Sequence, residues 1–213
     1  MTPLTHYRAV SDARDKGELL IYIQAVDEAS DGSELTPNEY LLALRTVSMT
    51  KTGKRMGLLP LYKGMEVRLT AKMNAKRGLV QDAVGLVFDI IFHPEEFKDD
   101  PDDNWFLDPT HAVWTRGVVC LKRLPLAVLV EFPHLDEDLG FGRGPNGGGI
   151  LAIEPSFANW EDGLVSRDRS IDGFDNTRRR TIPMRRCGLP LASARERTVQ
   201  TSQGILYFKR VME

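Results

Sequence analysis

The sequence is poor in cysteine and has no long apolar run. Cys120 and Cys187 are its two cysteines, 67 positions apart, and neither belongs to a CxxC pair. We therefore expect neither a disulfide framework nor a structural zinc site. No stretch approaches the ~18 apolar residues of a membrane span, and the N-terminus lacks the pattern of a secretion signal. These absences predict a soluble protein of the reducing cell interior with no membrane partner.

Several motifs that bind nucleotides or metals are incomplete in this chain. Thr52-Gly53-Lys54-Arg55 lacks the upstream glycine and the hydroxyl residue after the lysine that a phosphate-binding loop requires. Gly140–Gly144 lacks the third glycine of a dinucleotide fingerprint, and Asp99–Asp103 lacks calcium-loop spacing. Asp27-Glu28 follows an apolar run as a magnesium-binding pair would, but it could not organise ATP without a phosphate loop. We therefore predict no catalytic residue and no metal ligand.

The net charge of −2 conceals separate basic and acidic blocks. Residues 51–80 carry eight Lys or Arg against one acid, which gives +7. Residues 91–138 carry four against eleven, which gives −7, and residues 165–213 carry eleven against five, which gives +6. Two basic blocks fit a polyanionic partner. Ordinary hydrated surface stays open as the alternative, because neither block is a dense Lys/Arg tract.

The first 50 residues are predicted to form a helix, a strand and a second helix. An apolar residue recurs at every third position from residue 4, which indicates a helix, and Glu18–Val26 is a short apolar run typical of a strand. Thr36-Pro37-Asn38-Glu39 has the composition of a capping box and predicts the start of the second helix. The buried residues are predicted to be Leu4, Tyr7, Val10 and Ala13 in the first helix, and Tyr40, Leu41, Leu44 and Val47 in the second.

From residue 58 the pattern changes to short strands. Apolar and polar residues alternate from Met65 to Ala71, which is typical of a half-buried strand. Turns rich in Gly, Pro and Asp separate the segments, so we expect a small antiparallel barrel with an acidic loop over residues 93–109 and a glycine-rich loop over residues 140–149. Further strands are predicted at Val84–Phe92, Gly117–Lys122, Leu126–Phe132, Gly149–Ile153 and Ile205–Val211.

A segment near the end of the chain carries the most specific motif. An apolar Leu189-Pro190-Leu191 lead-in is followed by Thr198-Val199-Gln200-Thr201-Ser202-Gln203-Gly204. This arrangement resembles motif V of the RecD-like superfamily 1 DNA helicases of the Pif (petite integration frequency) family, in which a strand ends in Thr-Ile-His-Lys-Ser-Gln-Gly.

Three further segments resemble the same family in the same order. Leu61–Asn74 is similar to its Leu-x-x-Gly-x-x-Val-Met-Leu-x-x-Asn strand, and Gly78–Val87 to its Gly-Leu-x-Asn-Gly-x-x-Gly-x-Val turn and strand. Leu124–Phe132 is similar to its Leu-Pro-x-x-Val-x-Val-x-Phe strand. Together these segments resemble the SH3-like module that Pif helicases insert into their second RecA-like domain. The resemblance extends over residues 58–204.

The resemblance implies roles for residues of the motif V-like segment. Hydroxyls such as those of Thr198 and Ser202 can bind phosphate oxygens. The amide of Gln203 and the backbone at Gly204 suit sensing of a bound nucleotide beside the strand. The family's His and Lys are replaced here by Gln200 and Thr201, and the loss of the lysine removes a phosphate-neutralising charge. The implied nucleic-acid contacts are Thr198, Gln200, Thr201 and Ser202, and the implied nucleotide contacts are Gln203 and Gly204.

Two basic clusters outside this segment are candidate nucleic-acid contacts. Lys72, Asn74, Lys76 and Arg77 lie together in the first predicted hairpin of the barrel. The other cluster contains five arginines. Solvated surface is the alternative for both, and no aromatic residue lies among the arginines in sequence, so we predict no base-stacking platform. The arginines are Arg178, Arg179, Arg180, Arg185 and Arg186.

The predicted fold class is a strand-rich α+β protein in which an SH3-like small antiparallel barrel is inserted in an incomplete RecA-like second helicase domain. Residues 1–57 are expected to form a partial RecA-like segment, with a helix, a strand and a helix. Residues 58–155 are expected to be the barrel insertion with its acidic and glycine-rich loops. Residues 156–213 are expected to be a basic return segment with the motif V-like strand and loop.

The resemblance implies the C-terminal part of a Pif-like ATP-dependent DNA helicase that acts in the nucleus, in DNA repair. The expected partners are single-stranded DNA and the helicase's N-terminal domain. ATP and Mg are expected only in a full-length parent, since this chain lacks the phosphate loop and ends nine residues after Gly204, before the family's motif VI. Two alternatives stay open, namely a degenerate remnant that only binds nucleic acid and a protein-interaction module without enzyme activity.

Overall fold

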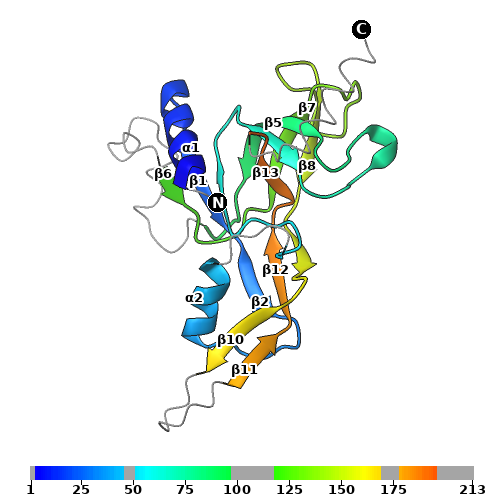
Figure 1. Ribbon diagram of the computed structural model, residues 1–213. Helices are drawn as coiled ribbons and strands as arrows, with labels where there is room; N and C mark the ends of the chain where they lie inside the picture. Colours follow the sequence, from blue (N-terminus) through cyan, green and yellow to red (C-terminus); the bar gives the residue numbers. More distant parts are fainter. Residues whose placement is uncertain (1–2, 46–50, 97–117, 169–177, 196–213) are drawn as a thin grey trace.

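The computed structural model describes residues 3–45, 51–96, 118–168 and 178–195 and has a strand-rich α+β fold (Figure 1). In chain order its elements are α1 (Pro3–Lys16), β1 (Leu20–Gln24), β2 (Val26–Ala29), α2 (Pro37–Arg45), β3 (Leu58–Leu61), β4 (Glu66–Leu69), the 3-10 helix η1 (Ala75–Arg77), β5 (Val84–Ile91), β6 (Val118–Cys120), β7 (Ala127–Phe132), β8 (Gly149–Ile153), β9 (Ser156–Asn159), β10 (Leu164–Asp168), β11 (Arg178–Ile182), β12 (Met184–Gly188) and β13 (Leu191–Ser193). Among the described residues, no helix is long and apolar enough to cross a membrane.

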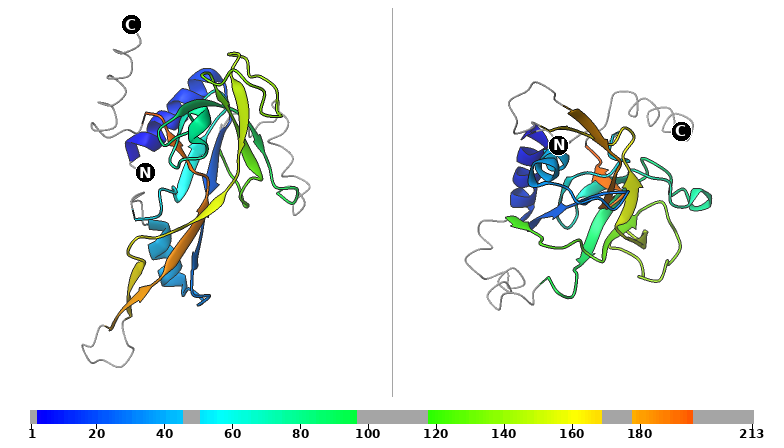
Figure 2. Two further views of the ribbon diagram at one scale, coloured as in Figure 1. Left: turned by 90° about the vertical axis from the view of Figure 1, so that its right-hand side faces the viewer. Right: turned by 90° about the horizontal axis from the view of Figure 1, so that it is seen from below.

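The elements form two lobes. The upper lobe contains α1, the sheet β3-β1-β6 and the sheet β13-β4-β5-β7-β8. The lower lobe contains α2, the sheet β2-β12-β9 and the hairpin β10-β11. Figure 1 and the left panel of Figure 2 show β2 and β12 running between the lobes, which gives the molecule an elongated shape. Each lobe has its own cluster of buried apolar side chains.

The five-stranded sheet is the scaffold of the upper lobe. All its strand pairs are antiparallel, and every side chain of β7, which lies between β5 and β8, is buried. The predicted alternation holds in β4, where Val67 and Leu69 are buried and Glu66 is exposed. The strands predicted over residues 84–92, 117–122, 126–132 and 149–153 are all present as β5 to β8.

The predicted closed barrel is not formed in the described part of the chain. The sheet is open, with β13 and β8 as its outer strands. Its apolar face packs against α1 and the β3-β1-β6 sheet in one core, so the burial of that face does not require the sheet to close on itself. The prediction of a barrel failed because short antiparallel strands with turn residues between them are common to barrels and to two packed open sheets.

Strand pairing joins the three segments into which the sequence was divided. β1 of the first segment pairs with β3 of the second, and β2 pairs with β12 of the third. β13, also of the third segment, extends the five-stranded sheet beside β4. The strands β9 to β12 were not predicted, because their polar and basic residues show little apolar alternation. The boundaries at residues 57 and 155 stay predictions.

Both predicted helices are present, and Ala13 is buried as predicted, but their buried faces otherwise differ from those predicted. In α1 the buried residues are Ala9 and Ala13, whereas Tyr7 is 72% exposed and Val10 is also exposed. The two alanines are four residues apart and therefore lie on one face, and their small side chains let the helix approach the sheet closely. The side chain of Leu4 lies outside the described residues.

The start of α2 is the predicted capping box. Glu39 N–H donates to Thr36 Oγ1 at 3.3 Å, and Thr36 N–H donates to Glu39 Oε2 at 3.0 Å. The predicted buried stripe is wrong at Tyr40 and Leu41, which are exposed, while Ala43 is fully buried. The side chain of Leu44 and all of Val47 lie outside the described residues.

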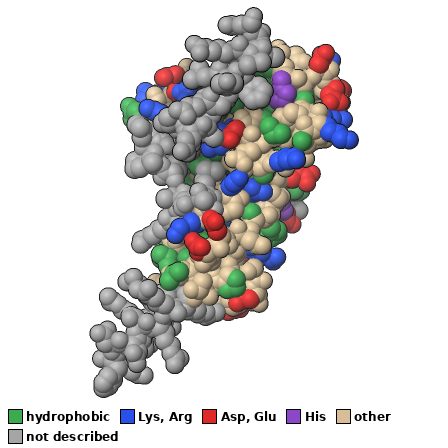
Figure 3. Space-filling model, turned by 45° about the vertical axis from the view of Figure 1, so that its right-hand side comes forward, with side chains coloured by type: hydrophobic (Ala, Val, Ile, Leu, Met, Phe, Trp, Pro, Cys, Tyr) green, Lys and Arg blue, Asp and Glu red, His purple; other side chains and the backbone are tan. Residues whose placement is uncertain are grey.

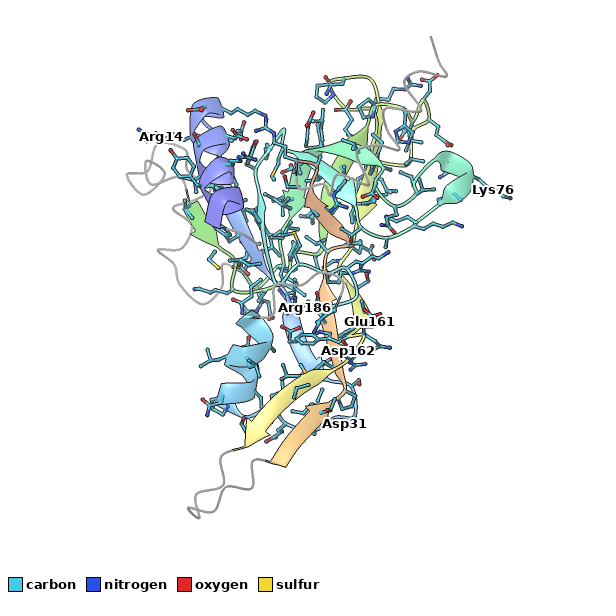
Figure 4. All side chains as sticks on the ribbon, viewed as in Figure 1. Arg14, Asp31, Lys76, Glu161, Asp162 and Arg186 are labelled. Atoms are coloured by element: carbon cyan, nitrogen blue, oxygen red, sulfur yellow. The ribbon has the colours of Figure 1, made fainter. Side chains whose placement is uncertain are left out.

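Arg186 lies fully buried at the junction of the lobes (Figure 4), where its guanidinium forms two hydrogen bonds with the carboxylate of Asp27. The Nε–Oδ1 distance is 2.7 Å and the Nη2–Oδ2 distance is 2.9 Å. Nη1 also donates to the carbonyl of Arg55 and Nη2 to that of Ala43, and the guanidinium carbon is 5.2 Å from the centre of the Trp160 ring. The prediction that Arg186 binds a polyanion is therefore wrong, and Asp27 is a structural carboxylate.

The neighbouring pair, Glu28 and Arg185, provides a natural comparison. Arg185 Nε lies 2.6 Å from Glu28 Oε1, but both side chains are about two-fifths exposed. Since Asp27–Arg186 and Glu28–Arg185 are successive register pairs of β2 and β12, strand alternation alone places one pair inside and the other outside.

We predict that Asp27→Asn lowers the free energy of unfolding by about 3–5 kcal/mol, because it leaves a buried guanidinium without a counter-charge. Glu28→Gln removes one negative charge from the adjacent position and is expected to cost about 0–1 kcal/mol, since its ion pair is exposed to solvent. Urea unfolding of both variants measures the difference. Equal losses in the two variants would show that burial of the Asp27–Arg186 pair does not support the fold.

Candidate nucleic-acid interface

The described residues that best fit nucleic-acid contact form a hairpin between β4 and β5. We call residues 72–80 the basic finger; it includes η1 and projects from the sheet, with Lys76 at its tip (Figure 4). Asn74 and Leu79 exchange two backbone hydrogen bonds, of 3.0 and 2.9 Å, at the neck of the finger. Gly78 has φ +73°, which lets the chain reverse there, and Leu79 is buried as an anchor. The finger is therefore braced by its backbone.

All four residues predicted in this hairpin are exposed and lie together on the finger. Arg77 is partly neutralised, since its Nε lies 3.1 Å from Glu137 Oε1. Within the described residues, Lys72 and Lys76 have no ion-pair partner, and the side chain of Asn74 does not cap η1. Two lysines and one amide thus face solvent with donors available for phosphate oxygens.

Further finger residues were missed by sequence reasoning. Met73 and Val80 are apolar yet 43% and 41% exposed, on the two arms of the finger. Lys54, which belongs to the rejected phosphate-loop motif, reaches the finger's base, where its Nζ donates to Gln81 Oε1 at 2.7 Å. Only the alternation of apolar and basic residues over 72–80 could have indicated Met73 and Val80, and no local signal links Lys54 to a residue 27 positions away.

Acidic side chains lie among the basic ones on this side of the molecule. Figure 3, turned so that the finger side comes forward, shows Lys and Arg side chains interspersed with Asp and Glu on the described surface. Arg68 pairs with Asp82 at 2.5 Å below the finger, and Arg143 pairs with Asp136 at 2.7 Å. Arg68 and Arg143 are thus neutralised, whereas Lys72 and Lys76 of the finger have no ion-pair partner among the described residues.

The second predicted cluster lies in the other lobe. Arg178, Arg179 and Arg180 begin β11, where they pair in register with Asp168, Arg167 and Ser166 of β10. Figures 1 and 2 place β11 at the far end of the lower lobe, away from the finger. The structure therefore does not bring the two basic clusters together, and the side chains of these arginines lie outside the described residues.

The fold brings an arginine and an aromatic ring together where the sequence indicated none. The Arg185 guanidinium carbon is 4.5 Å from the centre of the Phe157 ring, which is 54% exposed. The contact crosses from β12 to β9, and the residues are 28 positions apart, so no local pattern predicts it. Cys187 lies on the same strand as Arg185. Burial is the larger cause and the charge of Glu28 the second cause that raise the pKa of its thiol, so this thiol is protonated at neutral pH.

The glycine-rich loop over residues 140–149 closes over a buried carboxylate. Both oxygens of Glu131 accept hydrogen bonds, from Asn146 N–H at 2.8 Å, its side-chain amide at 3.0 Å and Gly148 N–H at 3.1 Å. A Cβ at Gly144 would lie 2.2 Å from the Glu131 carboxyl carbon, so glycine is required there. The glycines thus serve the packing of this loop on β7.

Within the described ranges, no group of three or more His, Cys, Asp and Glu could hold a metal ion.

The motif V-like residues Thr198, Gln200, Thr201, Ser202, Gln203 and Gly204 lie outside the described residues. The last residue of their apolar lead-in, Leu191, begins β13, in which Leu191 and Ala192 are fully buried, and Ala194 N–H donates to the Glu66 carbonyl at 3.1 Å. The lead-in is therefore fixed in the five-stranded sheet beside β4.

No family model matches the sequence, and no curated protein matches it. Among solved structures, the chain is similar to Pif1 helicase from Candida albicans, with a TM-score of 0.43 and 16% identity over 91% of this chain and 33% of that one. It is also similar to unliganded Pif1 from Bacteroides sp, with a TM-score of 0.36 and 11% identity over 91% of this chain and 40% of that one. For Bacteroides Pif1 bound to ssDNA, the TM-score is 0.35 and the identity is 8%, over 86% of this chain and 28% of that one. The chain thus spans about a third of the length of these proteins.

Proposed function

We propose that this chain is a nucleic-acid-contacting part of a Pif-like DNA helicase and that it holds single-stranded DNA through the basic finger. The observation that carries the proposal is the joint exposure of Lys72, Asn74 and Lys76 on one braced hairpin. The same hairpin is the segment in which the sequence resembles the family's Asn-containing turn. Residues chosen from sequence alone thus form one solvent-facing group.

The chemistry of the finger suits a single strand. The ammonium groups of Lys72 and Lys76 neutralise phosphates, and the amide of Asn74 can donate to a phosphate oxygen. Met73 and Val80 offer apolar surface to bases that a single strand leaves unstacked. None of these groups reads a base edge in a fixed geometry, so the binding is expected to be independent of sequence.

The motif V-like residues Thr198 to Gly204 would add the coupling between nucleotide state and grip on the strand. ATP and Mg would bind with groups that this sequence does not contain, among them a phosphate-binding loop. The N-terminal helicase domain is the proposed source of those groups. A nuclear location and a role in DNA repair, which only the family resemblance implies, belong to the same proposal.

One observation favours a second candidate function, protein interaction. Tyr40, Leu41 and Leu42 are consecutive apolar residues of α2, and all three are exposed. Such a surface is typical of a helix that packs against another polypeptide. If the chain is a protein-interaction module, it will not bind single-stranded DNA at any salt concentration.

We predict that the double variant Lys72→Ala/Lys76→Ala binds an oligo(dT) strand about tenfold more weakly than the unmodified chain at low salt. The slope of log affinity against log salt concentration should become shallower by about 1.4, because two phosphates are no longer neutralised. Fluorescence anisotropy at several salt concentrations measures both quantities. The control is Arg14→Ala/Lys63→Ala, which removes the same charge elsewhere; a loss as large in the control as in the finger variant would contradict the proposal.

The purified chain is expected to hydrolyse no ATP above background, with or without single-stranded DNA, because it has no phosphate-binding loop. A coupled assay for released phosphate tests this expectation. DNA-stimulated hydrolysis by the chain alone would overturn the proposed division between this part of the helicase and its nucleotide-binding part.

A further inference from the structure

A hollow of about 220 Å³ lies between α1 and the five-stranded sheet. One wall is α1, and the other is formed by the turn after β3, by β4 and β5, and by the end of β13. Ala9, Met65 and Leu86 give it an apolar lining, and the ring of Tyr62 lines it as well. This site is independent of the basic finger, since Figure 4 and the right panel of Figure 2 place α1 and η1 on opposite sides of the upper lobe.

Charged side chains line the hollow from both walls. Arg8, Asp12 and Lys16 recur every four residues and therefore lie along one face of α1. Arg195 reaches in from the end of β13, and its Nη1 lies 2.5 Å from Asp12 Oδ2. With Glu66 the lining holds three cations and two carboxylates, so its formal net charge is +1.

The three cations keep hydrogen-bond donors that the surrounding protein does not use. Lys16 Nζ donates to the Gly64 carbonyl at 3.0 Å and lies 5.1 Å from the centre of the Tyr62 ring, which fixes the ammonium in place. A guanidinium has five donors, and Arg195 directs one nitrogen at Asp12. Arg8 has no ion-pair partner within the described residues. The hollow is thus a preformed group of donors.

Tyr62 supplies a neutral donor to the same lining. Burial, and after it Asp12, raises the pKa of its phenol; Arg195 opposes this shift, and Glu66 adds the smallest contribution, which raises the pKa. A tyrosine hydroxyl is protonated at neutral pH and the raised pKa only extends that range, so Tyr62 can donate a hydrogen bond and adds no negative charge to the hollow.

We propose that this hollow binds a phosphate group, either of a free nucleotide or of a nucleic-acid backbone. A phosphate brings strong acceptor oxygens and at least one negative charge, which match donors converging from α1 and β13. The volume is below the ~300 Å³ at which pockets for drug-sized ligands begin, so the hollow suits a phosphate with its adjoining sugar. Arg8 is the residue that the ligand would engage without first displacing a protein partner.

The test compares two arginines of the same helix. Arg8 lines the hollow, whereas Arg14 projects away from it (Figure 4). Arg8→Ala and Arg14→Ala remove the same charge from α1, but only Arg8→Ala removes it from the hollow. Calorimetric titration with AMP and with inorganic phosphate, in buffer without divalent metal, should give binding that Arg8→Ala weakens on the order of tenfold. Arg14→Ala should leave it within about twofold. Thermal unfolding of both variants verifies that they are folded.

A second arm separates the two sources of phosphate. In the Lys72→Ala/Lys76→Ala background, where the finger is disabled, a short oligo(dT) is titrated with and without AMP. If AMP competes with the oligo(dT), and Arg8→Ala weakens the binding of the oligo(dT), the hollow binds backbone phosphate as well as free nucleotide. If AMP binds but the oligo(dT) does not, the hollow binds free nucleotide. The proposal is overturned if neither AMP, phosphate nor oligo(dT) binds, or if Arg14→Ala weakens binding as much as Arg8→Ala. Either failure leaves the finger's role untouched.

Discussion

The guanidinium of Arg186 is bound from several directions at the junction of the two lobes, and the position of every strand that crosses this junction depends on it. Asp27 of β2 neutralises it, the carbonyls of Arg55 and Ala43 accept one further hydrogen bond each, and Trp160 covers its face. Gly57 leaves room for it, since a Cβ there would lie 3.2 Å from Nη1. A buried charge with so many partners specifies one arrangement of β2, β12, α2 and the turn before β3 that contains Arg55, because any other arrangement would leave the charge uncompensated.

The two candidate sites are placed by the scaffold above that junction. The five-stranded sheet carries the basic finger on one side, between β4 and β5, and packs α1 on the other, beside the charged hollow. Both sites consist of cations attached to rigid elements: a hairpin braced by backbone hydrogen bonds, and a helix anchored by Ala9 and Ala13. Such rigidity reduces the conformational entropy that phosphate binding would cost.

Local chemistry could be predicted from the sequence wherever the interacting residues are close along the chain. The capping box of Thr36 and Glu39 and the alternation in β4 need a few neighbouring positions, and both are present. Arg185 and Arg186 show the opposite case, because they are adjacent and chemically alike, yet one is partly exposed and the other fully buried. The burial of each side chain depends on the register of β12 against β2. This register is set by contacts some 160 positions apart, so no local sequence pattern predicts it. The open sheet and the contact of Arg185 with Phe157 were missed for the same reason.

The central claim is that the basic finger holds single-stranded DNA. Photo-crosslinking of an oligo(dT) that carries 4-thiothymidine, followed by peptide mass spectrometry, locates the contact without any change to the protein. The account predicts that the main adducts lie on residues 72–80, and that they disappear at high salt because phosphate contacts dominate the affinity. Adducts confined to peptides of the lower lobe, or no adduct at low salt, would contradict it.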